Sequence, residues 1–275
     1  MHSKFKLRHI IQAVFFTLIF LTAINHSLSE SGITIPLIGG ASIHALCPFG
    51  AVVSFYQLLT TGSFVKKIHE SAMVLFSITL FLSILVGPVF CSWICPLGSL
   101  QEWVSSLGRR LGLHGKFNVS SNLDKKLGLL RYVVLLWVIY VTARSGELIF
   151  TNYDPYYALF NFWSGEVALS ALLILGLTLM LALFIERPWC KYTCPFGALL
   201  GLANIIRIFK IRRNKNTCID CQKCDATCPM NIEISGQTSI KDPRCISCLN
   251  CTSQNVCPIP QTVELSIRGD HNETS

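Results

Sequence analysis

The sequence predicts a mainly α-helical protein, in which a polytopic membrane helix bundle of about four transmembrane helices precedes a small cysteine-rich domain. Hydrophobic residues make up 51% of the 275 residues and charged residues only 14%, whereas a soluble domain has about 25% charged residues. The mean hydropathy of +0.50 also favours a membrane location. Eight of the 13 cysteines lie between Cys218 and Cys257, which indicates a separate unit near the C-terminus.

Four apolar runs are long enough to cross a hydrocarbon core, which requires about 20 residues. The first run follows Lys4, Lys6 and Arg8, as the core of a signal peptide would. No small-residue cleavage site comes after it, so we expect an uncleaved anchor. The predicted spans cover residues 10–28, 71–90, 127–144 and 167–185.

Basic residues predict the orientation, because cytoplasmic segments of membrane proteins are rich in Lys and Arg. The N-terminus and residues 109–131 are both basic. Both can be cytoplasmic only if an even number of spans separates them. The apolar segment 42–61, which a Cys-Pro-Phe-Gly turn interrupts at Cys47, is therefore expected to be re-entrant, although two lysines that follow it then lie outside. The loop 145–165 is predicted to be external.

The predicted topology is that of a multi-pass protein of the cytoplasmic membrane, with its N-terminus and its C-terminal domain in the cytoplasm. Residues 1–213 form the transmembrane domain and are expected to contact membrane lipid. The net charge of +8 is carried largely by residues beside the apolar runs. This charge is interpreted as a topology signal rather than as a nucleic-acid surface. We expect no nucleic-acid partner.

An internal repeat links two of the predicted spans. The sequence FCSWICPLGSL begins at Phe90, and the similar sequence WCKYTCPFGAL begins 99 residues later at Trp189. Each copy ends a span and leads into a segment of moderate amphipathicity, 97–113 and 196–209. Because two spans separate the copies, both are expected to point the same way.

The repeated C-x3-C-P motif places two cysteines at positions i and i+4, which share one face of a helix. Cys91 with Cys95, and Cys190 with Cys194, can therefore each ligate a metal centre. Together they supply four thiolates, the ligand count of a [4Fe–4S] cluster. The alternative is four buried, unreacted cysteines, but the matching C-P-x-G continuation favours ligation. Whether the pairs share one cluster is left open.

A third Cys-Pro-x-Gly element begins at Cys47, three residues after His44. These two side chains could supply an extra iron ligand or hold a quinone head group at the outer face. The other interpretation is a packed cysteine beside a turn.

The C-terminal cysteines carry the strongest motif. Cys218, Cys221, Cys224 and Cys228, followed by Pro229, form the C-x2-C-x2-C-x3-C-P run of bacterial ferredoxins. In such a run three thiolates bind one cluster and the fourth serves the neighbouring cluster. A structural zinc site is less consistent with this spacing, because zinc sites use two separated C-x2-C pairs.

A second run, Cys245, Cys248, Cys251 and Cys257, has a longer gap before its last cysteine. Two runs predict crossed ligation, which staples a unit too small to bury an adequate core. The sequence thus predicts a di-cluster ferredoxin domain over residues 214–266, followed by a disordered tail over 267–275. One cluster takes Cys218, Cys221, Cys224 and Cys257, and the other takes Cys245, Cys248, Cys251 and Cys228.

With these motifs in place, the chain resembles the NapH family of ferredoxin-type quinol dehydrogenase membrane subunits. The resemblance rests on the four spans, the CSWICPL sequence at Cys91, the second C-x3-C-P followed by Gly-Ala-Leu, and the di-cluster domain. The C-terminal half of NosR is similar too. The resemblance implies electron transfer between the quinone pool and other redox proteins. The element after His44 and the long gap before Cys257 depart from NapH, so the terminal acceptor is left open.

No general base or nucleophile site is apparent, so any chemistry belongs to the cofactors. The first hypothesis is a membrane-bound iron–sulfur electron carrier that serves as the electron-transfer subunit of a quinol dehydrogenase. The second is an assembly or regulatory factor that uses its clusters to reduce or mature another oxidoreductase. The third is a zinc-stabilised membrane scaffold.

Overall fold

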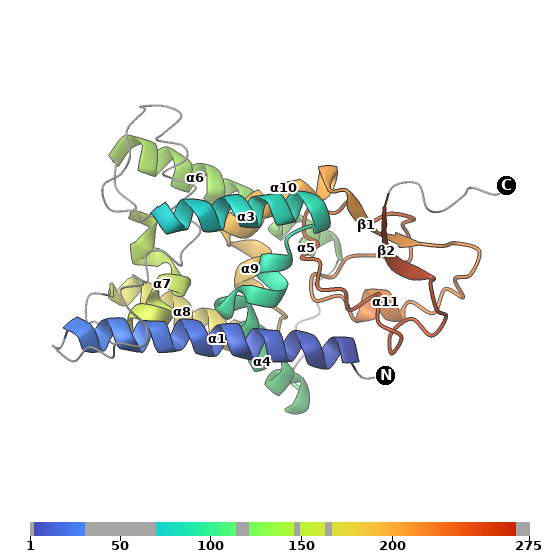
Figure 1. The fold of residues 1–275 in the computed structure, drawn as a ribbon, viewed down its shortest axis with the longest axis horizontal. Coiled ribbons are helices and arrows are strands. Elements are labelled where there is room, and N and C mark those ends of the chain that lie inside the picture. Colours follow the sequence, from blue (N-terminus) through green and yellow to red (C-terminus); the bar gives the residue numbers. More distant parts are fainter. Residues whose placement is uncertain (1–2, 31–69, 114–120, 146–148, 163–166, 268–275) are drawn as a thin grey trace.

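The computed structural model describes residues 3–30, 70–113, 121–145, 149–162 and 167–267, which form a helical part and a small C-terminal unit (Figure 1). Segment 42–61, with His44 and Cys47, lies outside these residues. The helical part contains α1 (Ser3–Glu30), α3 (Glu70–Val86), the π-helix η2 (Phe90–Ile94), α4 (Pro96–Arg110), α5 (Ser121–Leu127), α6 (Leu130–Ser145), the 3-10 helix η3 (Ile149–Tyr153), α7 (Pro155–Asn161), α8 (Leu169–Ala182), α9 (Pro188–Tyr192) and α10 (Pro195–Ile206).

The two repeat copies fold in the same way, as a long helix, a break, a single turn and a second helix. These are α3–η2–α4 and α8–α9–α10. The first break contains Gly87 at φ +97°, and the second contains Arg187 at φ +50°, both in the left-handed region. A proline at the first position of each following helix, Pro96 or Pro195, starts that helix without losing a backbone bond.

Two of the predicted spans have the expected length, and two are shorter. Leu7–Asn25 and Leu123–Arg144 are long and apolar enough to cross a membrane. Met73–Val86 and Leu169–Ala182 are apolar but belong to helices that end before the cysteine motifs. Gly87 and Pro88 directly follow α3 and end it, whereas α8 ends at Ala182, five residues before Arg187. The four-span bundle therefore stays a prediction.

The helices pack around apolar side chains from distant parts of the chain. α10 lies against α6 and α3, while α4 lies against α8 and α1. Val138, Leu200 and Phe196 are buried in one cluster with Phe76. The short helix α7 packs on α8 and α1, so part of the loop predicted to be external folds back onto the bundle.

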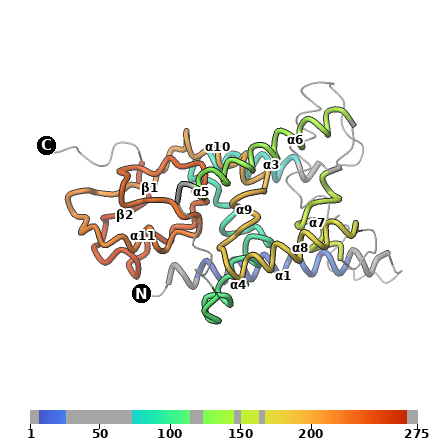
Figure 2. The backbone as a smooth tube through the Cα atoms, turned by 180° about the vertical axis from the view of Figure 1, so that it is seen from behind, coloured from blue at the N-terminus to red at the C-terminus, as the bar shows by residue number. Residues whose placement is uncertain are grey.

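The C-terminal unit is held together by one antiparallel pair of strands, β1 (Phe209–Arg213) and β2 (Val263–Ile267). The short helix α11 (Lys223–Ala226) and a series of turns carry the cysteines between the strands. Figure 1 and Figure 2 both place this unit at one end of the helices, beside the N-terminal end of α1. Arg8 Nη1 donates to Asn250 Oδ1 at 3.0 Å, which joins the two.

Candidate iron–sulfur centres and the charges around them

The C-x3-C-P cysteines straddle helix starts rather than lying on continuous helices. The Cys95 amide donates to the Phe90 carbonyl at 2.8 Å, and the Cys194 amide donates to the Trp189 carbonyl at 2.9 Å, which are both wide i→i+5 turns. Our prediction of a regular i, i+4 helical pair was wrong, because the proline that follows keeps the second cysteine out of the helical conformation. Cys95 and Cys194 are instead extended N-caps of α4 and α10.

The local structure also explains why the C-P-x-G motif contains a glycine. The Gly197 amide points at Cys194 Sγ at 3.3 Å, so the start of α10 donates to the sulfur. In the first copy, a Cβ on Gly98 would lie 2.8 Å from the Cys91 carbonyl oxygen, so only glycine fits. The C-P-x-G pattern thus describes a helix N-terminus that wraps around a thiol.

The structure brings the four repeat cysteines together. Cys95, Cys190 and Cys194 line a cavity of about 490 Å³, called here the membrane-site cavity. Cys91 does not line it, but its thiol lies within electrostatic range of Cys95, Cys190 and Cys194. Gln101 Nε2 donates to Cys190 Sγ at 3.5 Å. Two helix ends 99 residues apart in sequence therefore converge on one place.

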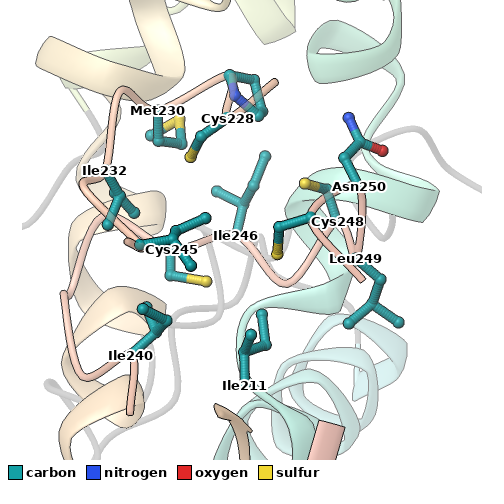
Figure 3. A pocket seen from close by; sticks show the side chains of 13 residues that line it. Ile211, Cys228, Met230, Ile232, Ile240, Cys245, Ile246, Cys248, Leu249 and Asn250 are labelled. Atoms are coloured by element: carbon teal, nitrogen blue, oxygen red, sulfur yellow. The ribbon is translucent and has the colours of Figure 1, made fainter. Parts of the chain in front are cut away.

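The C-terminal cysteines form two further groups. The first surrounds a cavity of about 380 Å³, the proximal cavity, which faces the helices; Figure 3 shows three of its cysteines around one space. Its walls are otherwise mainly aliphatic, with Ile211, Ile240 and Ile246 among them. The lining cysteines are Cys228, Cys245, Cys248 and Cys251.

The second group surrounds a cavity of about 350 Å³, the distal cavity, which includes the exposed Cys221. The long gap before Cys257 is absorbed by a turn, in which the amides of Val256 and Cys257 both donate to the Ser253 carbonyl at 2.9 Å. The lining cysteines are Cys218, Cys221, Cys224 and Cys257. Both groups have the membership that crossed ligation requires.

The donor sets of the two C-terminal cavities fit a [4Fe–4S] cluster. Each cavity is lined by four cysteines, which is the ligand number and the ligand type of such a cluster. Burial raises the pKa of Cys228 to about 12, and burial together with Asp225 raises the pKa of Cys224 to about 11. These thiols stay protonated at neutral pH unless a metal replaces the proton.

The proximal cavity is attached directly to the helical part. Arg207, at the end of α10, is 1% exposed and donates to the Ile240 carbonyl at 2.7 Å and to Ser247 Oγ at 3.0 Å. Its Nη1 lies 3.9 Å from Cys245 Sγ. Asn204 Nδ2 donates to the Cys245 carbonyl at 2.6 Å. A buried cation is thus held beside a predicted cluster ligand.

A buried ion cluster links the second repeat copy to the same cavity. Asp124, on α5, is fully buried and accepts from Lys191 Nζ at 2.7 Å and from Arg244 Nη1 at 3.4 Å. Lys191 follows Cys190, and Arg244 precedes Cys245. The Tyr192 hydroxyl donates to the same carboxylate at 2.5 Å. Asp124 therefore connects residues adjacent to two predicted centres.

A second ion cluster lies around Glu102 on α4. Arg187 Nη2 is 2.5 Å from Glu102 Oε2, and Arg8 pairs with the other carboxylate oxygen. Arg187 Nη1 also donates to the Cys91 carbonyl at 2.6 Å. Burial alone would raise the pKa of Glu102, but Arg187 and Arg8 outweigh it and lower the pKa to about 2. The cluster holds α1, α4 and the Cys91 turn together.

This pKa predicts the effect of Glu102→Gln. A carboxyl whose pKa falls from 4.5 to about 2 on folding contributes stability above pH 4.5, which is lost only as the pH falls towards 2. The substitution is expected to lower the free energy of unfolding by about 3 kcal/mol. Denaturant unfolding, followed by tryptophan fluorescence, should show the same difference at pH 5 and pH 8. A difference that disappears by pH 5 would contradict the lowered pKa.

Sequence reasoning missed Glu102, Asp124, Arg187 and Arg207, together with Asp154, which lines the membrane-site cavity. Charged residues near predicted spans were interpreted as topology signals, and their burial depends on contacts between distant segments. A cation directly before or after a ligand cysteine, as at Lys191 and Arg244, was the one available signal.

Comparison with known proteins identifies the repeat independently. A family described as "4Fe-4S binding domain" matches residues 68–114 and 167–215, which contain the two C-x3-C-P motifs. No solved structure matches the chain.

Among curated relatives, the chain is 30% identical over 233 residues to the putative electron transport protein YccM of Escherichia coli, covering 82% of this chain but only 64% of that protein. It is 30% identical over 232 residues to the ferredoxin-type protein NapH of Haemophilus influenzae, covering 78% and 76%. It is 27% identical over 183 residues to the regulatory protein NosR of Stutzerimonas stutzeri, covering 62% and 24%. The chain therefore belongs to the NapH-type family of ferredoxin-type, 4Fe–4S electron-transfer proteins.

Proposed function

We propose that this chain is a membrane-embedded carrier that passes electrons between the quinone pool and another redox protein. The observation that carries the proposal is the grouping of the cysteines in three places: eleven of them line three cavities, and Cys91 lies within electrostatic range of the first group. An electron from a quinol would pass first to a centre at the membrane-site cysteines, then to the proximal group and then to the distal group. Bound [4Fe–4S] clusters would supply the one-electron chemistry at each of these places.

The residues between these places support that order. Asp124 contacts Lys191 and Arg244, the neighbours of Cys190 and Cys245. Trp93, in the turn between Cys91 and Cys95, donates to the Ser247 carbonyl at 3.3 Å. These contacts hold the membrane-site and proximal ligands close to one another. Exposed Cys221 places the distal group at the surface, where a redox partner could approach.

Anaerobic purification tests this proposal. Three clusters predict about 12 iron atoms and as many acid-labile sulfides per chain. A menaquinol analogue should reduce at least part of this iron, observed as the appearance of EPR signals. Stoichiometric zinc without acid-labile sulfide would leave only the scaffold interpretation.

A regulatory or maturation role is the second candidate, favoured by the match to a protein named as regulatory, NosR. In that case the iron would be present, but quinols would not exchange electrons with it. Deletion of the chain would instead prevent maturation of another oxidoreductase, which activity measurements in the deletion strain would reveal.

A further inference from the structure

The membrane-site cavity differs in chemistry from the other two cysteine-lined cavities. The described residues that line the proximal and distal cavities are cysteines and apolar or small polar residues, and none of them carries an aromatic ring or a carboxyl group. The membrane-site cavity is larger, about 490 Å³ against 380 and 350 Å³. Its walls also hold a carboxyl group, Asp154, and five aromatic side chains: Phe90, Phe150, Tyr156, Trp189 and Phe196.

The residues that line the membrane-site cavity come from separate segments of the chain. Phe150, Asp154 and Tyr156 belong to η3 and α7, the segment that folds back onto the bundle. The thiols come from the N-caps of α4 and α10, Cys95 and Cys194, and from Cys190 in α9. Aromatic walls of this kind accommodate a flat, apolar ligand, which an iron–sulfur cluster alone does not need. The cavity thus has the lining of a site for an organic ligand next to a metal centre.

Asp154 provides the membrane-site cavity with a buried carboxyl group that can exchange a proton with a ligand. Its side chain caps α7, and Oδ1 accepts from the Tyr156 amide at 3.0 Å. The residue is only 7% exposed, and burial raises its pKa to about 7, although the amides of Tyr156 and Tyr157 act in the opposite direction. The other titratable groups lining the cavity are the Tyr156 hydroxyl and the three thiols. A carboxyl of this kind can gain or lose a proton at neutral pH.

We propose that the membrane-site cavity binds the ring of a quinol, with Asp154 as the group that receives its proton. This inference rests on the proposed function and locates its electron donor. The aromatic side chains would contact the ring, and the carboxylate would accept a hydrogen bond from a ring hydroxyl.

Oxidation of the quinol requires an acceptor for two protons and an acceptor for two electrons. A quinol becomes a quinone by losing two protons and two electrons. One O–H bond breaks with transfer of its proton to the Asp154 carboxylate, which then releases it to water. The second hydroxyl, at the opposite end of the ring, loses its proton to water. Clusters bound by the repeat cysteines and by the C-terminal cysteines would take up the two electrons one at a time, each electron reducing one ferric iron to ferrous iron.

Ligand binding tests the location. A short-chain naphthoquinone added to the iron-loaded, detergent-solubilised protein should quench tryptophan fluorescence in a saturable way. Trp189→Phe removes the indole fluorophore that lines the cavity and should abolish most of this quenching. Trp137→Phe, on the half-exposed face of α6, is the matched control and should leave it. Equal saturable quenching in both variants would overturn the proposed location.

Turnover tests the proton acceptor. Asp154→Asn keeps a residue that caps helices as well as aspartate does but removes the base, so quinol-driven reduction of the iron should slow by about 100-fold. Iron content and reduction by dithionite should be unchanged, and Glu233→Gln, an exposed carboxyl elsewhere, should behave as wild type.

The outcomes separate the two proposals. If quinols never reduce the wild-type iron, the proposed function fails. If they do, and Asp154→Asn retains the full rate while Trp189→Phe retains the quenching, only the site proposed here is overturned.

Discussion

Replacing both Cys91 and Cys190 by serine is expected to remove about a third of the iron, if three four-iron clusters are bound, and to leave the C-terminal clusters loaded. The two cysteines lie in different repeat copies, and their thiols lie within electrostatic range of the same partners. Neither lines the proximal or the distal cavity. Losing two of four thiolates leaves too few ligands for a cubane.

Iron and acid-labile sulfide analysis of the anaerobic protein measures this loss, and EPR after dithionite reduction identifies the signals that remain. Cys218→Ser is the reciprocal variant, because it should affect only the distal group. Quinol-driven reduction should disappear in the double variant even though dithionite still reduces the C-terminal iron. Equal iron loss from all three groups in the double variant would contradict separate sites.

Asp124→Asn is expected to lower the free energy of unfolding by about 3–5 kcal/mol, because it leaves a buried cation without its counter-charge. Lys191 is 1% exposed and has the Asp124 carboxylate at 2.7 Å. Arg244 keeps a second carboxylate, Asp242, at 2.6 Å. The uncompensated group is therefore Lys191, beside the membrane-site ligand Cys190.

A matched control for this prediction is an exposed ion pair that also involves α5. Lys125 pairs with Glu233 at 3.5 Å, but their side chains are 47% and 61% exposed. Glu233→Gln should change stability by less than about 1 kcal/mol. Denaturant unfolding of both variants, followed by cluster absorbance and tryptophan fluorescence, measures the difference. Similar effects of the two substitutions would show that burial of Asp124 does not determine its contribution.

The cysteine groups could be predicted from the sequence because their information is local. Short spacings between thiols and a following proline are properties of a few consecutive residues, and the proximal and distal cavities contain the predicted sets. Even the long gap before Cys257 changes only a turn. The grouping of the repeat cysteines followed from the similarity of two segments.

The surroundings of these cysteines could not be predicted in the same way. Asp124 lies in a short polar segment whose sequence gives no sign of complete burial, and its partners are 67 and 120 positions away. Asp154 lies in a loop that apolar patterning placed outside the bundle, and only the packing of α7 brings it to the cysteines. Both α3 and α8 end earlier than predicted. Hydropathy does not detect the break before Pro88 that ends α3, and it does not locate the end of α8 at Ala182.

The position of Cys95 and Cys194 as the N-caps of α4 and α10 has an electrostatic consequence for the proposed centre. The N-terminal end of a helix carries a partial positive charge of about half an elementary charge, and two such ends meet at the membrane-site cysteines. An iron–sulfur centre bound there would carry one more negative charge when reduced than when oxidised, so both helix macrodipoles would stabilise its reduced state. The repeat would thus raise the midpoint potential of this centre and make it a better electron acceptor than the same ligands on an irregular loop.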